Sequence, residues 1–404
     1  MKSKKTTLKD FLEGKLTQDE INQVNRSFEI VGDIAIIEIP KSLDEKSKVI
    51  GEALLKVNRN IKTILKKSGI HKGEFRTQKL IYIAGENKKE TIYKENGIKL
   101  KIDPENVYFS ARLSTEREFL MNNLGKKRVL VMFSGSGPYS FVALKKQPNL
   151  KRILSLEINP IGHKYALENR ELNKNLIKKS DLFVDIKSFL KEKNLPIYEK
   201  NLVKIFNDLF VNFYCLDVKL AFENFKLNII DEDFSFDNLN LDILKLYDFL
   251  SNLDKKRLFV DLDNMKMNKE IIYLLVLFSF KFDYVFKINN KKYLFDNGYK
   301  KGVLINYLKE NIDIEKIYLF DEIFMPLPKD ASNFLKEAFN FADSNAIIHM
   351  YDFVEEKDFP KLSEKKVLLA AKKYKRDVEI IQTRKVGQYS PRKYRVCCDF
   401  KILN

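Results

Sequence analysis

A buried strand followed by a glycine-rich loop constrains this chain more than any other feature of its sequence. Residues 129–133 form a continuous apolar run, and Ser134-Gly135-Ser136-Gly137-Pro138 follows it directly. A helix-like stretch comes next, and a second apolar strand, 152–157, ends in the acid Glu157. Strand, glycine loop, helix and strand with a terminal acid form the first half of a doubly wound sheet. We therefore predict an α/β fold with a Rossmann-like sheet.

The glycine loop and the acid after it also suggest a ligand. Because glycine has no Cβ, Gly135 and Gly137 let the backbone approach a bound molecule, although a tight strand-to-helix turn without a ligand fits the loop equally well. Glu157 favours a ligand, since an acid at the end of the second strand accepts both hydroxyls of a ribose. Asn159-Pro160 follows this acid, and Ser140 replaces the third glycine of the dinucleotide fingerprint. The pattern is typical of an S-adenosylmethionine site in a class I methyltransferase.

The charge balance indicates an anionic partner, and the rare residue types exclude several kinds of site. Lys and Arg number 73 against 56 Asp and Glu, a formal net charge of +17, so a polyanion such as nucleic acid is an expected partner. The 3 cysteines form no C-x-x-C pair and the 3 histidines form no H-x-x-x-H pair. We therefore expect neither a disulfide scaffold nor a metal site.

No part of the sequence predicts a membrane anchor. Residues 1–10 are basic, but no apolar segment follows them as a secretory signal requires. The longest apolar run, 271–280, has about half the length of a helix that spans a bilayer. We expect a cytoplasmic protein without membrane association.

The first part of the chain predicts a small α+β module over residues 28–113, preceded by a polar N-terminal extension, 1–27. Residues 28–40 are rich in β-formers, with a turn at Gly32-Asp33. Apolar residues at helical spacing predict a helix over about 46–67. Two further stretches predict short strands: 78–84 and 91–101.

The rest of the chain, 114–404, predicts the larger Rossmann-like domain. A helical bridge over about 114–125 leads into it, and its third strand is expected at 182–185. The alternation of strands and helices stops between about 190 and 312, so we expect an insertion there. The rhythm then returns in strands expected near 322–328, 345–353, 377–383 and 394–400.

Short motifs along the chain occur in a fixed order. They are 28–40, 73–77, 95–97, 107–117, 132–140, 157–160, 168–173, 321–328, and 389–392 with 399–400. In this order they resemble the archaeal and eukaryotic tRNA guanine-37 N1-methyltransferases, a family related to the transferases of wybutosine synthesis. The resemblance covers about 28–185 and 320–402.

The resemblance implies an enzyme that transfers a methyl group from S-adenosyl-L-methionine to N1 of guanosine 37, next to the anticodon of tRNA. Removing the N1 proton requires a base, and a cation stabilises the charge that develops on O6. By the resemblance, Glu116 of the T-E-R motif is the base and Arg76 of the G-x-x-R-T motif supports O6. From the residue types alone, both side chains also fit a surface ion pair or a helix cap.

The resemblance further implies which residues hold the cofactor. Tyr108 and Phe109 match a segment beside its methionine end, and they equally fit the core of a strand. Asp185 would end the third strand near the adenine amino group or cap a helix, and Asp217 competes for that position. The other residues would pack near the cofactor, let the backbone approach it or bind its ribose: Phe133, Gly135, Gly137 and Glu157.

For the RNA, Arg112 and Arg117 are candidates for phosphate contacts or for local pairing, and Pro326 and Pro328 for the turn against the target base. Two positions depart from the family. Val131 stands where the family commonly has Asp, so one polar contact to the cofactor is missing. Pro326 replaces an Asn that helps hold the target base, and proline has no donor to offer.

We expect a monomeric enzyme that binds the anticodon stem-loop of tRNA, in part through the small module, and needs no metal. Two alternatives stay open. A wybutosine-pathway enzyme would transfer the aminocarboxypropyl group, or methylate carbon 7 of a tricyclic base, at the same tRNA position. A non-catalytic tRNA-binding protein with the same fold is the other. Val131 and Pro326 favour this last alternative, whereas Arg76, Glu116 and Glu157 oppose it.

Overall fold

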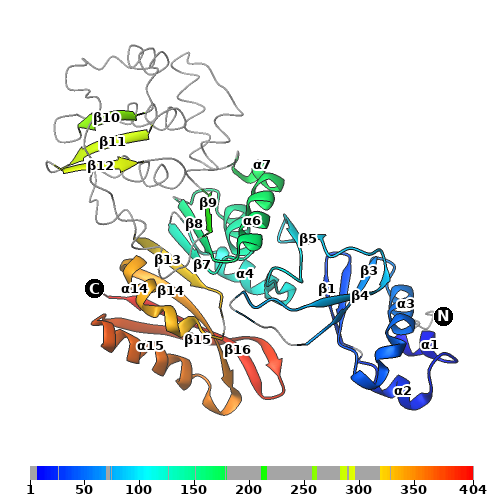
Figure 1. The fold of residues 1–404 in the computed structure, drawn as a ribbon. Coiled ribbons are helices and arrows are strands. Elements are labelled where there is room, and N and C mark those ends of the chain that lie inside the picture. The colour runs from blue at the N-terminus through cyan, green and yellow to red at the C-terminus, as the bar shows by residue number, and fades with distance from the viewer. Residues whose placement is uncertain are drawn as a thin grey trace. The chain divides into compact units, whose positions relative to one another are not determined.

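The chain folds into two compact units (Figure 1). The N-terminal unit comprises residues 1–118, 135–138 and 158–172, and the sheet unit comprises 119–134, 139–157 and 173–404. Among the residues described, no helix is long and apolar enough to cross a membrane. The computed structural model describes residues 7–25, 27–69, 73, 75–125, 127–150, 152–177, 179, 211–215, 257–261, 283–288, 291–295, 319–327 and 329–403.

The N-terminal unit is built on a four-stranded sheet in the order β1-β2-β3-β4. The central pair, β2 and β3, is parallel, and the two outer pairs are antiparallel. A parallel pair needs a crossover connection, and α3 supplies it. The predicted turn at Gly32-Asp33 is confirmed between β1 and β2. The elements are α1 (Leu8–Leu12), α2 (Gln18–Gln23), β1 (Phe28–Val31), β2 (Ile34–Ile37), the 3-10 helix η1 (Lys41–Lys46), α3 (Ser47–Val57), β3 (Thr63–Lys67) and β4 (Leu80–Gly85).

Helices α1 and α2 are part of this unit, so the polar extension expected over 1–27 is wrong from residue 8 onward. The start of α2 is a capping box, in which Thr17 Oγ1 accepts from the Glu20 N–H at 3.3 Å and Glu20 Oε2 accepts from the Thr17 N–H at 2.8 Å. Four apolar side chains of the segment are at most 7% exposed in a core shared with α3: Leu12, Leu16, Ile21 and Val24.

The helix expected over 46–67 is also corrected, because it ends at Val57 and residues 63–67 form β3. Asn58 has an extended backbone, with φ −137° and ψ 102°, which stops the helix. Thr63 and Ile64 are fully buried and pair in parallel with β2. Sheet pairing therefore outweighs the local helical spacing of this stretch.

A hairpin completes the N-terminal unit. Its turn, Asn96-Gly97, has positive φ at both residues, 46° and 77°, which matches the right-handed twist of the two strands. Helix α6 packs against the second strand of the hairpin. The elements are β5 (Thr91–Glu95), β6 (Ile98–Ile102), the 3-10 helix η2 (Ala111–Leu113), α4 (Ser114–Met121) and α6 (Pro160–Leu172).

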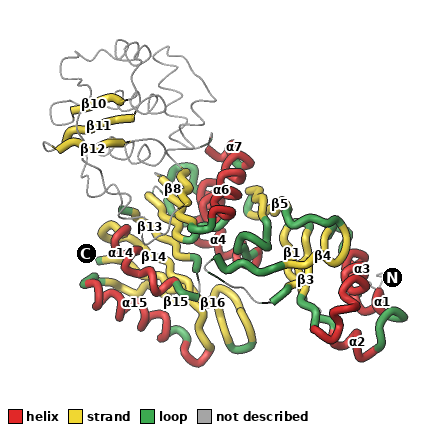
Figure 2. Tube along the Cα trace, in the orientation of Figure 1, coloured by secondary structure: helices red, strands yellow, loops and turns green. Residues whose placement is uncertain are grey.

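The sheet unit is built on a seven-stranded sheet in the order β15-β16-β14-β13-β7-β8-β9. Figure 2 labels five of its strands: β8, β13, β14, β15 and β16. Its pairs are parallel except those of β16, which lies antiparallel between β14 and β15. The predicted Rossmann-like fold is therefore confirmed. The elements are β7 (Arg128–Met132), α5 (Pro138–Lys146), β8 (Arg152–Glu157), α7 (Lys174–Ile177), β9 (Val211–Cys215), β13 (Phe320–Met325), η4 (Ala331–Phe334), α14 (Leu335–Phe341), β14 (Ala342–Glu355), η5 (Glu356–Asp358), α15 (Lys361–Tyr374), β15 (Val378–Ser390) and β16 (Lys393–Ile402).

The core of the sheet unit lies between the sheet and helices α14 and α15. Every residue of β7 is buried. A central parallel strand is covered on both faces, so its sequence reads as a continuous apolar run rather than an alternation. This is why 129–133 could be recognised from the sequence.

A strand that was not predicted lies beside β8 within the described part of the sheet. The strand beside β8 is β9, which pairs with it in parallel from Ile153↔Val211 to Glu157↔Cys215. The predicted segment, 182–185, lies outside the described residues, as do Asp185 and Asp217. Within the segment where an insertion is expected, three strands form a separate sheet: β10 (Arg257–Asp261), β11 (Asp283–Ile288) and β12 (Lys291–Phe295).

Candidate active site

The strand order of the large sheet reverses at β7. This strand pairs with β8 on one side and with β13 on the other, where Phe324 lies opposite Val131. In open α/β sheets, ligands bind beyond the carboxyl ends of the strands at such a reversal. Strand β7 leads into Phe133 and β13 leads into Pro326, so two residues predicted for the site lie at this edge.

Phe133 has an unusual backbone conformation. Its φ is +58°, in the left-handed region that side chains with a Cβ rarely occupy. Its ring makes an edge contact with Phe334, with 4.8 Å between ring centroids, and packs against the core of the sheet unit. The next residue, Ser134, donates its N–H to Leu156 O at 2.9 Å, which ties the loop to the end of β8. Strain of this kind gathers at functional sites.

The loop after Phe133 contains buried hydroxyls that lack partners. Ser134 and Ser136 are 3% and 1% exposed, and neither Oγ has a hydrogen-bond partner within the described part of the chain. An unsatisfied buried hydroxyl costs about 1–3 kcal/mol. Gly135 and Gly137 have φ of +56° and +85°, so the loop needs glycine for its conformation. A bound molecule with polar groups would fit this loop.

Asn169 of α6, which we did not predict as a site residue, holds the glycine loop in place. It is fully buried, and its Nδ2 donates to Ser136 O and Lys101 O at 3.1 Å each. Its Oδ1 accepts from the Lys101 N–H at 2.5 Å. One amide side chain therefore fastens the loop to β6. The signal in the sequence was the motif over 168–173, but no local pattern shows which partners an Asn will find.

Glu157 ends β8, as predicted, and is partly buried. Asn159, two residues further on, precedes the first residue of α6. Its Oδ1 accepts from the Ile161 N–H at 3.0 Å, which caps the helix, and its Nδ2 donates to Asn106 O at 2.7 Å. Pro160 then takes the first helical position, where its missing N–H is harmless. The Asn-Pro pair thus links the start of α6 to the chain just before Tyr108.

Tyr108 and Phe109 are both partly buried in the N-terminal unit. They lie in the connection between β6 and η2, so the prediction of a strand core is not met. The Phe109 ring makes an edge contact with Tyr93, at 5.0 Å between centroids. The carbonyl of Tyr108 lies against Gly135, where an added Cβ would sit 3.4 Å from Tyr108 O. The structure therefore brings Tyr108 and the glycine loop together.

Arg117 is corrected as a substrate-binding residue. It is 1% exposed, and its guanidinium donates to both carboxylate oxygens of Glu95, at 2.6 and 2.5 Å, and to Ser110 O. A side chain buried and paired in this way is not available to an RNA phosphate. Local pairing, the other role considered for it, is what the structure shows.

The remaining predicted residues of the N-terminal unit lie on α4, η2 and a turn. Glu116 lies in the first turn of α4 and is partly buried, and Arg112 lies in η2 and is exposed. Arg76 is partly buried, has φ +50° and donates its N–H to Gly73 O at 3.2 Å. The predicted roles of these three side chains stay predictions.

The turn after β13 survives the replacement of Asn by Pro326. Leu327 donates its N–H to Met325 O at 2.8 Å and accepts from the Ala331 N–H at 3.0 Å, so the turn is closed by backbone hydrogen bonds. Val131 is fully buried in β7, consistent with an apolar residue there. Pro328 lies outside the described residues.

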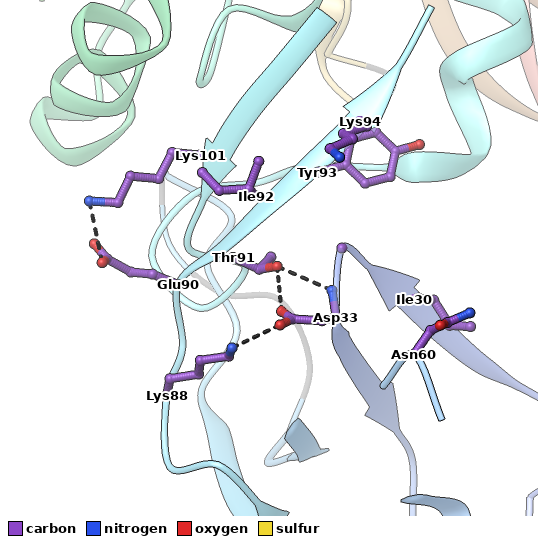
Figure 3. A pocket seen from close by; sticks show the side chains of 11 residues that line it. Ile30, Asp33, Asn60, Lys88, Glu90, Thr91, Ile92, Tyr93, Lys94 and Lys101 are labelled. Atoms are coloured by element: carbon purple, nitrogen blue, oxygen red, sulfur yellow. Dashed lines mark hydrogen bonds and ion pairs between the residues drawn. The ribbon is translucent and has the colours of Figure 1, made fainter. Parts of the chain in front are cut away.

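A groove of about 940 Å³ lies in the N-terminal unit (Figure 3). Across it, Asp33 accepts from Lys88 Nζ at 2.8 Å and from Thr91 Oγ1 at 2.7 Å, and Glu90 pairs with Lys101 at 3.3 Å. Burial raises the pKa of Asp33, but its hydrogen bonds with Lys88 and Thr91 outweigh burial and hold that pKa below the usual range. The charges in the groove are thus largely paired, and they join the β1–β2 turn to β5.

One cluster could in principle ligate a metal. Within the described residues, His349, Cys397 and Asp399 bring ligand atoms to within 4.8 Å of one another. Asp399 already accepts from Arg384 Nε at 3.0 Å, and His349 Nε2 lies 2.7 Å from Glu322 Oε1. A cation would have to displace these partners, so the cluster is better explained as a charge network inside the sheet.

Two domain families match the sequence. The TYW2 N-terminal domain matches residues 8–88, beginning where α1 begins. The TRM5/TYW2 methyltransferase domain matches residues 91–195 and 292–381. The interval that this match omits, 196–291, falls in the segment where an insertion is expected.

Individual relatives are similar over different lengths. The chain is 48% identical over 150 residues to the tRNA (guanine(37)-N(1))-methyltransferase Trm5b of Pyrococcus abyssi, which covers 37% of this chain and 44% of that protein. It is 28% identical over 383 residues to the tRNA (guanine(37)-N(1))/4-demethylwyosine(37)-methyltransferase Taw22 of Nanoarchaeum equitans, covering 93% of this chain and 100% of that protein. The match to the first relative thus spans less than half of its length.

The fold agrees with a solved structure. The crystal structure of wild-type Trm5b from Pyrococcus abyssi aligns with a TM-score of 0.57 at 25% identity, covering 100% of this chain and 82% of that one. The two domain matches, the order of the motifs and the sheet topology agree with one another. The chain belongs to the family of proteins that carry the TRM5/TYW2 methyltransferase domain.

Proposed function

We propose that the protein transfers a methyl group from S-adenosylmethionine to N1 of guanosine 37 in tRNA. The observation that carries the proposal is the 48% identity over 150 residues to a tRNA (guanine(37)-N(1))-methyltransferase. The edge of the sheet at β7 and β13 supports it, because ligands of open α/β sheets bind at such a reversal of strand order and the glycines there let a ligand approach the backbone.

The chain's own residues fit the cofactor. When bound, S-adenosylmethionine supplies a methyl group on a positively charged sulfur. The hydroxyls of Ser134 and Ser136 need polar partners, and the cofactor offers several. Glu157 accepts the ribose hydroxyls from the end of β8, and Tyr108 and Phe109 line the methionine end. Asp185 stays our proposal for the adenine amino group. Its alternative, Asp217, gains support because it follows β9 by two residues.

The transfer step requires a base and a cation. The N1 lone pair forms the new bond to the methyl carbon, the carbon–sulfur bond breaks, and the N1 proton passes to the Glu116 carboxylate. Arg76 donates to O6, where negative charge develops as the proton leaves. Pro326 and Pro328 shape the turn against the target base, and Arg112, which is exposed, contacts a phosphate. None of these steps uses a metal, so chelators should leave the rate unchanged.

The proposal is tested with labelled cofactor and two tRNA transcripts that carry guanosine or adenosine at position 37. N1-methylguanosine should form only with guanosine, and nuclease digestion with mass spectrometry identifies it. Glu116→Gln should lower the rate at least 100-fold. Glu118→Gln, on the same helix two residues away, is the matched control and should keep the wild-type rate. Absence of N1-methylguanosine with wild-type protein would overturn the proposal.

A second candidate activity is methylation of 4-demethylwyosine at the same position. The similarity to Taw22, which is named for both substrates, extends over 93% of this chain and favours it. Offering tRNA that carries 4-demethylwyosine beside the guanosine transcript separates the two activities. We also propose that the protein is cytoplasmic and acts as a monomer. Light scattering tests the monomer, because the mass of the protein–tRNA complex should equal that of one protein and one tRNA.

A further inference from the structure

The hairpin of β5 and β6 holds the segment that carries two of the proposed site residues, Phe109 and Glu116. Glu95, the last residue of β5, binds the Arg117 guanidinium through both carboxylate oxygens, at 2.6 and 2.5 Å. Both side chains are 1% exposed. The same guanidinium donates from Nη1 and Nη2 to Ser110 O, at 3.2 Å each. One buried ion pair therefore fixes the start of α4 and the chain seven residues before it.

Asn96, the first residue of the turn, holds the same helix from another side. Asn96 Nδ2 donates to Ser114 O at 3.0 Å and to Ser114 Oγ at 3.3 Å. Asn96 has φ +46°, so its side chain is presented by a turn conformation that Asn tolerates well. The first residue of α4 is thereby fastened to the hairpin independently of Arg117.

The aromatic residue Phe109 belongs to this assembly. The Arg117 guanidinium lies 5.3 Å from the centroid of the Phe109 ring, and Tyr93 of β5 contacts the ring edge-on at 5.0 Å. A cation over an aromatic face is attracted to it. Arg117 thus contacts Glu95, Ser110 and Phe109 together, which a Lys with a single charged nitrogen could not do.

We propose that Glu95 and Arg117 are positioning residues that fix Glu116 and Phe109 relative to each other for methyl transfer. The proposal rests on the proposed function, in which Glu116 is the base and Phe109 lines the cofactor. Glu116 is next to Arg117 in α4, and consecutive helical side chains point about 100° apart. The pair therefore cannot be the reacting groups. The ion pair instead sets the rotation of α4 about its axis and its position along that axis, and α4 carries the proposed base.

A purely stabilising role explains the pair poorly. Burying two charges requires removing both from water, and replacing a buried ion pair by apolar residues of similar size is often neutral or stabilising. A bidentate Arg–carboxylate pair instead defines an orientation. Orientation matters here, because a displacement of about 1 Å at the reacting groups lowers a rate about 100-fold.

A double apolar variant separates the two roles. Glu95→Leu with Arg117→Met removes both charges and keeps the core filled, so the melting temperature should stay near that of the wild type. Its single-turnover rate at saturating tRNA and cofactor should fall 10- to 100-fold. Its tRNA affinity should change less than threefold. A wild-type rate in this stable double variant would overturn the proposal.

Arg117→Lys and a second ion pair provide the controls. Arg117→Lys keeps the charge but loses the bidentate geometry, so it should also slow transfer without weakening tRNA binding. Asp321→Asn breaks the Arg128–Asp321 pair, whose closest contact is 2.6 Å, at the other end of β7. It should lower the melting temperature and keep the rate. A slowed Asp321→Asn enzyme would show that any broken ion pair slows transfer, which would overturn the proposal.

Hydrogen exchange gives a readout that does not depend on the substrate. Amides over 108–117 should exchange faster in the double variant than in the wild type, while those of β7 and β8 stay unchanged. Unchanged exchange over 108–117 would overturn the positioning role. If the wild type methylates no tRNA, the proposed function fails by itself, and the exchange experiment still decides whether the pair orders this segment.

Discussion

His349 Nδ1 lies 2.7 Å from Asp399 Oδ1 in the interior of the large sheet, where the two residues face each other across β14 and β16. The second ring nitrogen, Nε2, lies 2.7 Å from Glu322 Oε1 on the other neighbouring strand, β13. With a carboxylate at each nitrogen, the imidazole is held as a cation that donates twice. Phe324 stacks on the ring at 4.5 Å between centroids. Three strands of the sheet are thus joined by one charged side chain.

This arrangement predicts that stability falls at alkaline pH. Burial lowers the pKa of His349, but its hydrogen bonds with Asp399 and Glu322 outweigh burial and raise the pKa to about 9, above the ordinary value of 6.5. The stabilisation is therefore complete below pH 6.5 and is lost as pH rises through 9. It amounts to about 3 kcal/mol. Urea unfolding from pH 6 to 9.5 should show the decline in the wild type.

The alkaline decline should disappear in His349→Gln, which should also be less stable than the wild type at pH 6. His163→Gln is the matched control. Burial lowers the pKa of His163, so that side chain gives no stabilisation that is lost between pH 6.5 and 9. The control should keep the decline. An equal decline in His349→Gln would show that another group causes it.

At acidic pH the same network should lose stability as pH falls, whereas at alkaline pH it loses stability as pH rises. Burial raises the pKa of Asp399, but its hydrogen bond with His349 and the charges of His349 and Arg384 outweigh burial and lower the pKa to about 2. A carboxyl with a lowered pKa stabilises the fold at pH values above its ordinary pKa, and this contribution is lost as pH falls toward 2. The network should therefore be most stabilising between about pH 4 and 6.5.

How much the sequence predicted depended on the range of the interactions involved. The fold class followed from 129–133 and the glycine loop, because a buried parallel strand and the turn after it are encoded locally. The strand that lies beside β8 was not predicted. Strand β9 is defined by its pairing with β8. The 53 positions between Glu157 and Val211 contain no sequence pattern that predicts where this strand begins.

For the candidate site too, positions set by local sequence could be predicted, and contacts between distant residues could not. Phe133, Gly135 and Glu157 could be located because each sits at a strand end or in the loop that follows. The role of Arg117 could not be decided, since its partner Glu95 lies 22 residues away and on another element. Asn169 was missed for the same reason. Its hydrogen bonds reach 33 and 68 residues back along the chain, and an Asn in a helix gives no local hint of them.

Breaking the charge cluster at the start of β7 should destabilise the sheet unit. Arg128 Nη2 lies 2.6 Å from Asp321 Oδ1 and 2.6 Å from Asp343 Oδ2, with an Arg128 side chain that is 11% exposed. Arg128→Met leaves two carboxylates facing each other, so the free energy of unfolding should fall by about 2–4 kcal/mol. Urea midpoints measure it. Adding Asp321→Asn and Asp343→Asn should recover part of the loss, and no recovery would contradict the electrostatic cause.

Removing the amide that fastens the glycine loop should weaken cofactor binding. Asn169→Ala deletes the hydrogen bonds to Ser136 O and to both backbone groups of Lys101. The loop then loses its anchor to β6, and the affinity for S-adenosylhomocysteine should fall about tenfold, which equals about 1.4 kcal/mol. Titration calorimetry measures it. Glu171→Gln, on the exposed side of the same helix, should bind like the wild type, and equal weakening in both would point to a general effect on α6.

The conformation of the glycine loop can be tested at Gly135. An added Cβ would lie 3.4 Å from Tyr108 O, an ordinary contact, so space is available. The φ of +56° is the obstacle, because a residue with a Cβ loses about 1–2 kcal/mol there. Gly135→Ala should therefore lower stability by about 1 kcal/mol and also weaken cofactor binding, as the loop relaxes away from its left-handed form.

Gly125, with φ +62° and no atom within 4 Å of an added Cβ, is the matched position. Gly125→Ala should show the same loss of stability with unchanged affinity. If both variants bind the cofactor equally well, the backbone of Gly135 is not part of the site.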